Sequence, residues 1–264
     1  MTVYDKNKAR LSFDRAAHRY DQSAKLQQQV ANHLIELVKQ QKTTAAVTLD
    51  IGCGTGQVTE AMCELFPQGD VLGLDFSRRM LAQTKTRLAL KGFAAELICA
   101  DADHPPFISN SFDLIVSSLM LQWSNNLGST LKSYQSMLKD DGKMIFNTFT
   151  DGTLTEVKQS WRAVDEQAHT SQFLTKQDLH SIVESAGFSH VEILYDTITM
   201  TYPSVREMIT EMKQIGASNA HKNRERGLTG KQRFNSFEQA FEDFRQQNGQ
   251  YPCTWKLAYV ICNK

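Results

Sequence analysis

The chain has 264 residues, enough for one large α/β domain or for one domain with an appendage. Lysine and arginine together number 29, as do aspartate and glutamate, so no net charge draws the whole protein toward nucleic acid or a membrane. The five cysteines form no C-x-x-C pair and the seven histidines show no ligand spacing, so we expect reduced thiols and no metal site. No apolar run reaches membrane length and the first residues lack a signal-peptide core, which favours a cytoplasmic protein.

The first predicted elements are helices within residues 9–39, where apolar side chains recur at helical spacing. Phe13 and Tyr20 fall on one face of the first helix. Because this segment precedes the first predicted strand, we expect residues 1–42 to form a helical cap over the open edge of a sheet. The hydroxyl of Tyr20 needs a polar partner, which makes this residue a candidate for a site beneath the cap.

Residues 47–51 form a short apolar run, typical of a strand that is buried on both faces. Glycines follow at Gly52, Gly54 and Gly56, and a helical pattern begins directly after them. A strand that turns through glycines into a helix brings backbone N–H groups close to a ligand. The dinucleotide-binding fingerprint does not fit, because Gln57 stands where its third glycine belongs.

Two acidic residues at the ends of the first two predicted strands narrow the choice of ligand. Asp50 would repel a pyrophosphate but attract an ammonium group, directly or through water. Asp75 is placed to accept hydrogen bonds from both hydroxyls of a ribose. An amino-acid head joined to a ribose describes S-adenosylmethionine, and the glycines and both acids together resemble the class I methyltransferases. Ser77 is predicted to cap the next helix, residues 80–90, and Phe76 and Met80 are candidates to flank the adenine ring.

The third predicted strand, residues 95–100, leads into a further acidic residue, Asp101. Its carboxylate is a suitable acceptor for the exocyclic amine of adenine, and the N–H of Ala102 is placed to meet a ring nitrogen. Asp103 is the alternative acceptor for the amine. All these side chains follow strand ends, so they are expected at one edge of the sheet.

The fourth and fifth predicted strands are residues 112–117 and 143–149, with a helix and then a turn at residues 141–142 between them. Strands that alternate with helices predict a doubly wound parallel sheet, whose ligand crevice lies at the carboxyl ends of the strands. In class I methyltransferases the end of the fourth strand faces the methyl group. The resemblance therefore places Ser117 beside the cofactor and Gln122 at the rim of the reaction centre.

The second half of the chain predicts two more strands, with a long segment between them that holds two helical patterns. We interpret this segment as a helical lid over the crevice. The class I resemblance completes the expected fold, an α/β, Rossmann-like, doubly wound seven-stranded sheet whose last strand is antiparallel. The predicted strands are 191–202 and 255–262; the predicted helices are 155–166, 175–186, 205–215 and 235–247; the predicted units are the core, 43–202 plus 252–264, and the lid, 203–251.

The first part of the predicted lid is basic. Between residues 203 and 233 seven basic side chains stand against three acidic ones, a net charge of +4 in a neutral chain. Such a run is usually a solvated surface, but this one lies on the segment expected to face the acceptor. It favours an anionic substrate or an acidic protein partner. A nucleic-acid partner is not expected, because interleaved aromatic side chains are missing from the patch.

Several segments carry a narrower resemblance: 121–123, 161–166, 213–217, 228–230 and 249–254, together with His221 and Arg224. They closely resemble the malonyl-acyl-carrier-protein O-methyltransferases of biotin synthesis. The string from Phe13 to Tyr20 also resembles a methyltransferase lid in which the tyrosine closes over the cofactor. The resemblance implies methyl transfer from S-adenosylmethionine to the free carboxylate of malonyl-acyl carrier protein, or of malonyl-CoA, with S-adenosylhomocysteine as product. The methyl ester would then be elongated toward pimeloyl.

The expected chemistry needs no general base, because a carboxyl group titrates near pH 4 and is ionised at pH 7. The enzyme has to hold the reacting atoms in line and exclude water. Few direct contacts are expected, since a strong ion pair would weaken the nucleophile. The candidates to orient the carboxylate are Lys213, His221 and Arg224 from the lid, with Tyr20 and Gln122 from the rim.

Two alternatives remain open. A class I methyltransferase with another acceptor, such as a small-molecule acid, a phenol or a quinone, shares most of these features. A proton-bearing acceptor would need a base, for which His104 and His221 are candidates. A non-catalytic S-adenosylmethionine-binding regulator is the other alternative, and the intact glycine loop with Asp50, Asp75 and Asp101 argues against it.

Overall fold

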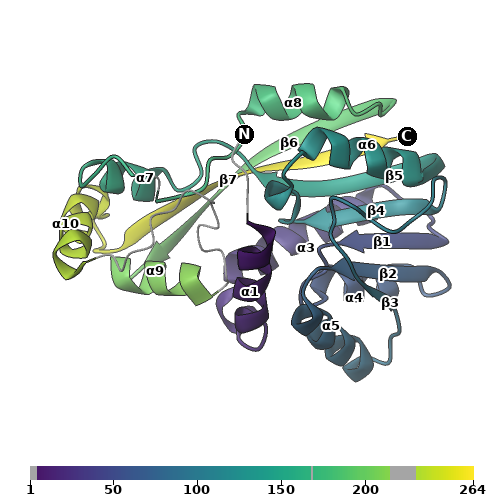
Figure 1. The fold of residues 1–264 in the computed structure, drawn as a ribbon, viewed down its shortest axis with the longest axis horizontal. Helices are drawn as coiled ribbons and strands as arrows, with labels where there is room; N and C mark the ends of the chain where they lie inside the picture. The colour runs from purple at the N-terminus through teal and green to yellow at the C-terminus, as the bar shows by residue number, and fades with distance from the viewer. Residues whose placement is uncertain (1–4, 168, 215–229) are drawn as a thin grey trace.

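The computed structural model describes residues 5–167, 169–214 and 230–264, and its centre is a seven-stranded sheet in the order β3-β2-β1-β4-β5-β7-β6 (Figure 1). Strand β7 pairs antiparallel with β5 and with β6, while the other pairings are parallel. This arrangement confirms the predicted fold class. The strands are β1 Val47–Ile51, β2 Asp70–Asp75, β3 Glu96–Cys99, β4 Phe112–Ser118, β5 Leu138–Phe149, β6 His190–Tyr202 and β7 Tyr251–Asn263.

Helices cover both faces of the sheet (Figure 1). Successive residues of a strand point to opposite faces of the sheet, so alternate residues share a face. Leu49 and Ile51 of β1 join the core on one face, while Leu114 and Val116 of β4 join the core on the other. Full burial of such a side chain contributes about 1.5–3 kcal/mol, which makes these two apolar layers the main support of the sheet. The helices are α3 Lys25–Gln40, α4 Gln57–Leu65 and α5 Arg78–Leu90 on one face, and α6 Leu127–Met137 and α8 Lys176–Glu184 on the other.

Two further helices, α1 (Lys6–Ala16) and α2 (Tyr20–Ser23), lie beside the carboxyl ends of the central strands (Figure 1). Asp5 caps α1 by accepting a hydrogen bond from the Lys8 N–H at 3.1 Å. Ser77 caps α5 as predicted, since its Oγ accepts from the Met80 N–H at 3.1 Å. None of the described helices is long and apolar enough to cross a membrane.

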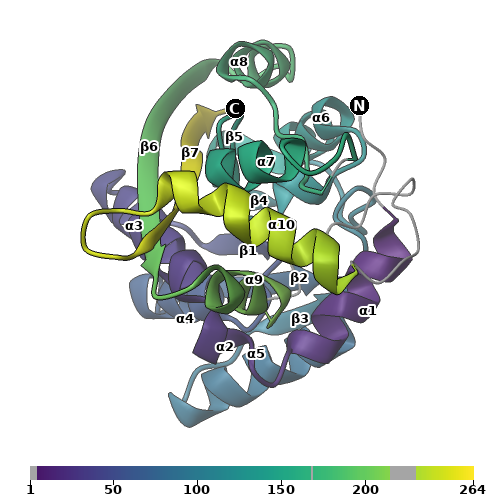
Figure 2. The same cartoon turned by 90° about the vertical axis from the view of Figure 1, so that its left-hand side faces the viewer.

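Between β6 and β7 the chain forms α9 (Val205–Gln214) and α10 (Lys231–Phe241). Figure 2 shows both helices in front of the strand ends, close to α7 (Thr155–Arg162). Trp161 of α7 stacks on Phe237 of α10, with ring centroids 4.3 Å apart, which fixes these two helices to each other. Helix α10 begins at Lys231 rather than at residue 235, and it ends earlier than predicted because a 3₁₀ turn follows Phe241.

Strand β5 also begins earlier than predicted. Leu138 pairs with Phe112 before the register shifts, and Asp141 adopts a left-handed φ of 66°. The expected turn at residues 141–142 is therefore an irregularity within the strand. It leaves the carboxyl end of β5, which borders the site, in its predicted place.

Candidate active site

A cleft of about 780 Å³, including its open mouth, lies between helix α1 and the carboxyl ends of the central strands. We call it the first chamber. The strand ends supply its polar wall, and α1 supplies an apolar one. Its lining includes, from the predicted set, Tyr20, Gly52, Gly54, Asp75, Phe76, Met80, Asp101 and Ala102, and beyond that set Lys6, Phe13, Ser118, Leu119, Met120 and Trp123.

The glycine loop has the backbone that its sequence predicted. Gly52, Gly54 and Gly56 adopt φ values of 69°, 56° and 88°, a region that other residues occupy only with strain. A Cβ on Gly52 would lie 2.3 Å from Cγ of Met120 in the chamber wall. Gly56 does not line the chamber: a Cβ there would lie 2.6 Å from Cγ2 of Thr84, so this glycine lets the loop pack against α5.

Asp75 ties the glycine loop to the end of β2. One carboxylate oxygen accepts from the Gly54 N–H at 3.0 Å and the other from the Ser77 N–H at 2.7 Å. Burial raises the pKa of Asp75 to about 6, although these two N–H groups act against it, and nearby Asp14 raises the pKa further. The carboxylate is ionised at neutral pH and presents an acceptor to the chamber.

Besides Gly56, two predicted cofactor residues lie behind the chamber wall rather than on it. Asp50 is 1% exposed, and its carboxylate accepts from Oγ1 of Thr59 at 2.6 Å, which ties β1 to α4. Burial raises the pKa of Asp50 to about 7, the Thr59 hydrogen bond acting in the opposite direction. Ser117 is fully buried and donates to the Ile51 carbonyl at 2.9 Å. Ser118 lines the chamber instead, because the next residue of a strand points the other way.

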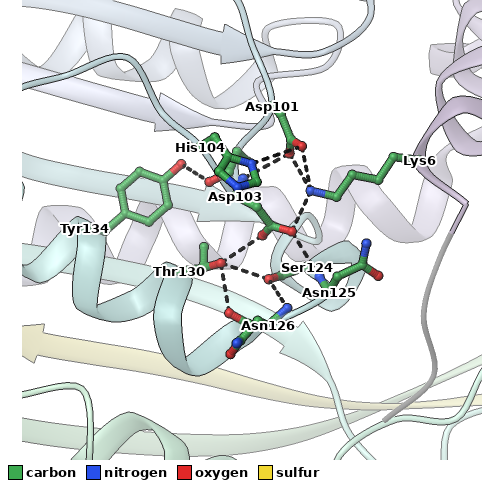
Figure 3. A network of polar contacts seen from close by, with 10 residues as sticks. Lys6, Asp101, Asp103, His104, Ser124, Asn125, Asn126, Thr130 and Tyr134 are labelled. Carbon is green, nitrogen blue, oxygen red and sulfur yellow. Dashed lines mark hydrogen bonds and ion pairs between the residues drawn. The ribbon is translucent and has the colours of Figure 1, made fainter.

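Figure 3 shows a polar network around Lys6, Asp101 and Asp103, three residues that line the first chamber. The Nζ of Lys6, from α1, lies 2.6 Å from Asp101 and 2.5 Å from Asp103. Asp103 also accepts from Thr130 Oγ1 at 2.8 Å and from the Asn125 N–H at 3.1 Å. Although burial opposes ionisation, these hydrogen bonds lower the pKa of Asp103. The side chain of Asp103 is 11% exposed against 39% for Asp101, so Asp101 is the better placed acceptor for a ligand.

A second chamber of about 760 Å³, including its open mouth, adjoins the first where four side chains line both cavities, and we call these four side chains the partition. Phe13, Tyr20, Leu119 and Trp123 line both chambers. Phe13 meets Trp123 edge to face, with ring centroids 5.7 Å apart, and Leu119 holds a left-handed φ of 50°, a strained conformation at the point where the chambers meet. The remaining lining residues are Gln27, Gln122, Phe149, Leu154, His169, Thr170, Ser171, Phe173, Met212 and Trp255.

Two residues that line the second chamber each carry a buried polar atom with no hydrogen-bond partner within the described residues: Oε1 of Gln122 and Nε1 of Trp255. The other end of the Gln122 amide donates to the Leu119 carbonyl at 2.7 Å. His169 is engaged, since its Nε2 lies 2.8 Å from Asp165, whose other oxygen accepts from Arg233 at 2.7 Å. Buried polar groups are normally paired, so the chamber is built to receive polar groups of a ligand.

The acceptor residues predicted from sequence divide into three groups. Tyr20 and Gln122 line the second chamber. Lys213 is exposed on α9 and does not line it, whereas the neighbouring Met212 does, because the two point to different sides of the helix. His221 and Arg224 lie outside the described residues. His104 is mostly exposed beside Asp101, with 3.6 Å between Nδ1 and a carboxylate oxygen, and belongs to the first network.

Sequence reasoning missed His169 and Trp255. Trp255 directly follows the matching segment 249–254, and His169 comes shortly after the segment 161–166. Those two segments were the available signal. Neither residue was singled out, because no local pattern shows that β7 and the chain after α7 border the same cavity.

Residues 49–146 match a sequence family described as a methyltransferase domain. The chain is 34% identical over 262 residues to the malonyl-(acyl-carrier protein) O-methyltransferase of Gallionella capsiferriformans, covering 97% of this chain and 90% of that protein. It is 35% identical to the biotin biosynthesis bifunctional protein BioHC of Saccharophagus degradans, covering 96% of this chain and 46% of that protein. The YcgJ protein of Bacillus subtilis has the same fold, with a TM-score of 0.62 at 17% identity over 88% of this chain and 98% of that one.

Proposed function

Because the chain belongs to the malonyl-(acyl-carrier protein) O-methyltransferases, we propose that it methylates the free carboxylate of malonyl-acyl carrier protein with S-adenosylmethionine. The product is the malonyl methyl ester that begins pimeloyl formation in biotin synthesis. One observation carries the proposal beyond family membership: two chambers of similar size meet at the partition. A group can pass between two ligands only where their sites meet in this way.

The residues of the first chamber fit S-adenosylmethionine. Asp75, buried and ionised at the end of β2, would accept from the ribose hydroxyls. Asp101 would accept from the adenine amine, with Phe76 and Met80 beside the ring. The glycine loop leaves room for the methionine end, since a Cβ on Gly54 would have only one atom within 4 Å, a backbone oxygen at 3.9 Å. Asp50 would act from behind the loop.

The residues near the partition have to orient a carboxylate and keep water out. S-adenosylmethionine, when bound, would supply a methyl group on a positive sulfur that can leave with the carbon–sulfur electron pair, and the residues near the partition would present the carboxylate oxygen to it. The acceptor carries its charge at neutral pH, so no side chain has to remove a proton. Phe13, Tyr20 and Trp123 surround the meeting point and exclude water. Burial and the nearby Asp75 raise the pKa of Tyr20, so its hydroxyl keeps its proton.

An acidic carrier protein is the proposed partner of the basic insertion. Among the described cations of the insertion, Arg206 pairs with Glu238 and Arg233 with Asp165, so both serve the fold. Lys213 and Lys231 are exposed and remain as candidate contacts with the partner. Paired charges contribute little to steering, whereas exposed ones raise the association rate.

Mass spectrometry of the carrier protein tests the proposal directly. The purified enzyme is incubated with S-adenosylmethionine and malonyl-acyl carrier protein, and we expect the carrier to gain the mass of one methyl group. Acetyl-acyl carrier protein, which lacks the free carboxylate, is the matched control and should gain nothing. Absence of product on the malonyl form, or equal methylation of both carriers, would contradict the proposed function.

A further inference from the structure

We infer that Trp255 holds the carboxylate of the acceptor by donating a hydrogen bond from its indole N–H inside the second chamber; the inference rests on the proposed function. Trp255 lines this chamber and is only 4% exposed. Its Nε1 has no partner within the described residues. An indole N–H can only donate, so the group that satisfies it must be an acceptor, and a carboxylate oxygen is the strongest acceptor that the proposed substrate offers.

Gln122, a second residue that lines the chamber, also carries a buried atom without a partner among the described residues. Oε1 of Gln122 is an acceptor, and the amide cannot usefully turn over because its NH₂ already donates to the Leu119 carbonyl at 2.7 Å. An acceptor repels a carboxylate oxygen and attracts an N–H. The carboxylate is therefore turned away from Gln122 and toward Trp255. Gln122 is left for a donor, such as an amide N–H of the thioester arm.

The backbone on both sides of Trp255 is clamped, which gives the donor a fixed position. The Thr254 N–H donates to Glu156 of α7 at 3.1 Å, and the Thr254 hydroxyl donates to the same carboxylate. The Lys256 N–H donates to Oγ1 of Thr153 at 2.9 Å. The indole also packs on Phe149, with ring centroids 5.0 Å apart. A donor held in this way keeps its direction as the substrate arrives.

A neutral donor suits the chemistry better than a cation does. The described lining of the second chamber contains no lysine or arginine, and its histidine, His169, already contacts Asp165 at 2.8 Å. Asp165 is itself paired with Arg233, and the His169 ring stacks on Trp161 at 3.7 Å between centroids. A full ion pair would stabilise the negative charge of the carboxylate, which would make its oxygen a weaker nucleophile. An indole N–H orients the group and leaves its charge largely intact.

The test compares substrates with and without the carboxylate in the variant Trp255→Phe, which keeps an aromatic ring but has no N–H. We expect the KM for malonyl-acyl carrier protein to rise about 10-fold to 100-fold, the range for a lost hydrogen bond to a charged group. The inhibition constant of acetyl-acyl carrier protein should change less than about twofold, because that ligand has no carboxylate. The dissociation constant of S-adenosylmethionine, which binds in the first chamber, should not change.

Tyr259→Phe is the matched control variant. Tyr259 lies on the same strand, is fully buried and also has an unpartnered hydroxyl, but it lines neither chamber. It should leave both ligands unaffected. If Trp255→Phe weakens the binding of the malonyl and acetyl carriers equally, or leaves the KM for malonyl-acyl carrier protein unchanged, the role of Trp255 is overturned while the proposed function stands. A wild-type enzyme that gives no methyl ester overturns both.

Discussion

Alanine at Gly52 is expected to disturb both the fold and the first chamber, and two other glycines separate the causes. Gly52 has a φ of 69°, and a Cβ there would meet Met120 Cγ at 2.3 Å. Gly92 has a similar φ of 73° with no atom within 4 Å. Left-handed strain costs about 1–2 kcal/mol, and alanine recovers about 0.4–1 kcal/mol by stiffening the unfolded chain. Displacing Met120 adds about 1–3 kcal/mol, which gives about 3 kcal/mol for Gly52→Ala and about 1 kcal/mol for Gly92→Ala.

Thermal melts and cofactor titrations measure these two effects. For a chain of this size 1 kcal/mol shifts Tm by about 2–4 °C, so Gly92→Ala should melt about 2–4 °C lower and Gly52→Ala about 6–12 °C lower. Because Met120 lines the first chamber, Gly52→Ala should also bind S-adenosylmethionine at least about tenfold more weakly, whereas Gly92→Ala should bind it normally. Equal melting temperatures for the two variants, with unchanged affinity in both, would refute the packing of Met120 on the loop.

Four other outcomes are expected. Gly54→Val should abolish cofactor binding in a protein that still folds, because the valine side chain would enter the chamber. Circular dichroism measures the folding and calorimetry measures the cofactor affinity, and a normal affinity would contradict the loop assignment. The pKa of Asp75 is raised to about 6, so the affinity for the cofactor should fall as pH drops from about 7 to 5. The variant Asp75→Asn should bind the cofactor more weakly at every pH, and its affinity should not change over this pH range. The pKa of Asp50 is raised from 3.8 to about 7, so its stabilisation of the fold is complete below pH 3.8 and lost as pH rises through about 7, a change on the order of 4 kcal/mol. As pH rises from about 4 to 7, the Tm of the wild-type protein should therefore fall relative to the Tm of Asp50→Asn. If the two Tm values instead change in parallel with pH, the argument from burial of Asp50 is refuted. Reversing Lys213 and Lys231 to glutamate should raise the KM for malonyl-acyl carrier protein several-fold more than that for malonyl-CoA, and equal losses would remove the docking proposal.

The local part of the architecture could be read from the sequence because its causes are local. The buried strand β1, the left-handed glycines and the Ser77 cap each depend on a few consecutive residues, and the structure has them where they were predicted. The family was recognised from scattered segments, and comparison over nearly the whole chain confirms it. The cofactor contacts of Asp75 and Asp101 stay predictions, now with both side chains in the chamber wall.

Two kinds of information could not be obtained from the sequence: the direction in which a side chain points, and contacts between residues far apart in the chain. Ser118 lines the chamber and Ser117 does not, because neighbouring residues of a strand point to opposite faces; the cofactor role of Ser117 stays a prediction. Asp50 lies behind the glycine loop, where it accepts a hydrogen bond from Thr59 of α4, and its role toward the cofactor stays a prediction. The pair Lys6 and Asp101 is separated by 95 positions, and a single sequence holds no signal that the two meet. Such contacts are set by tertiary packing.

The partition between the chambers has a consequence for inhibition. Phe13, Tyr20, Leu119 and Trp123 line both cavities, so no thick layer of protein separates the proposed cofactor chamber from the proposed acceptor chamber. A single compound that joins an adenosine to a short chain ending in a carboxylate would occupy both cavities at once. Its second half would bind as an intramolecular event, with an effective concentration in the millimolar range when the linker matches the span. Neither fragment alone would approach the affinity of the joined molecule.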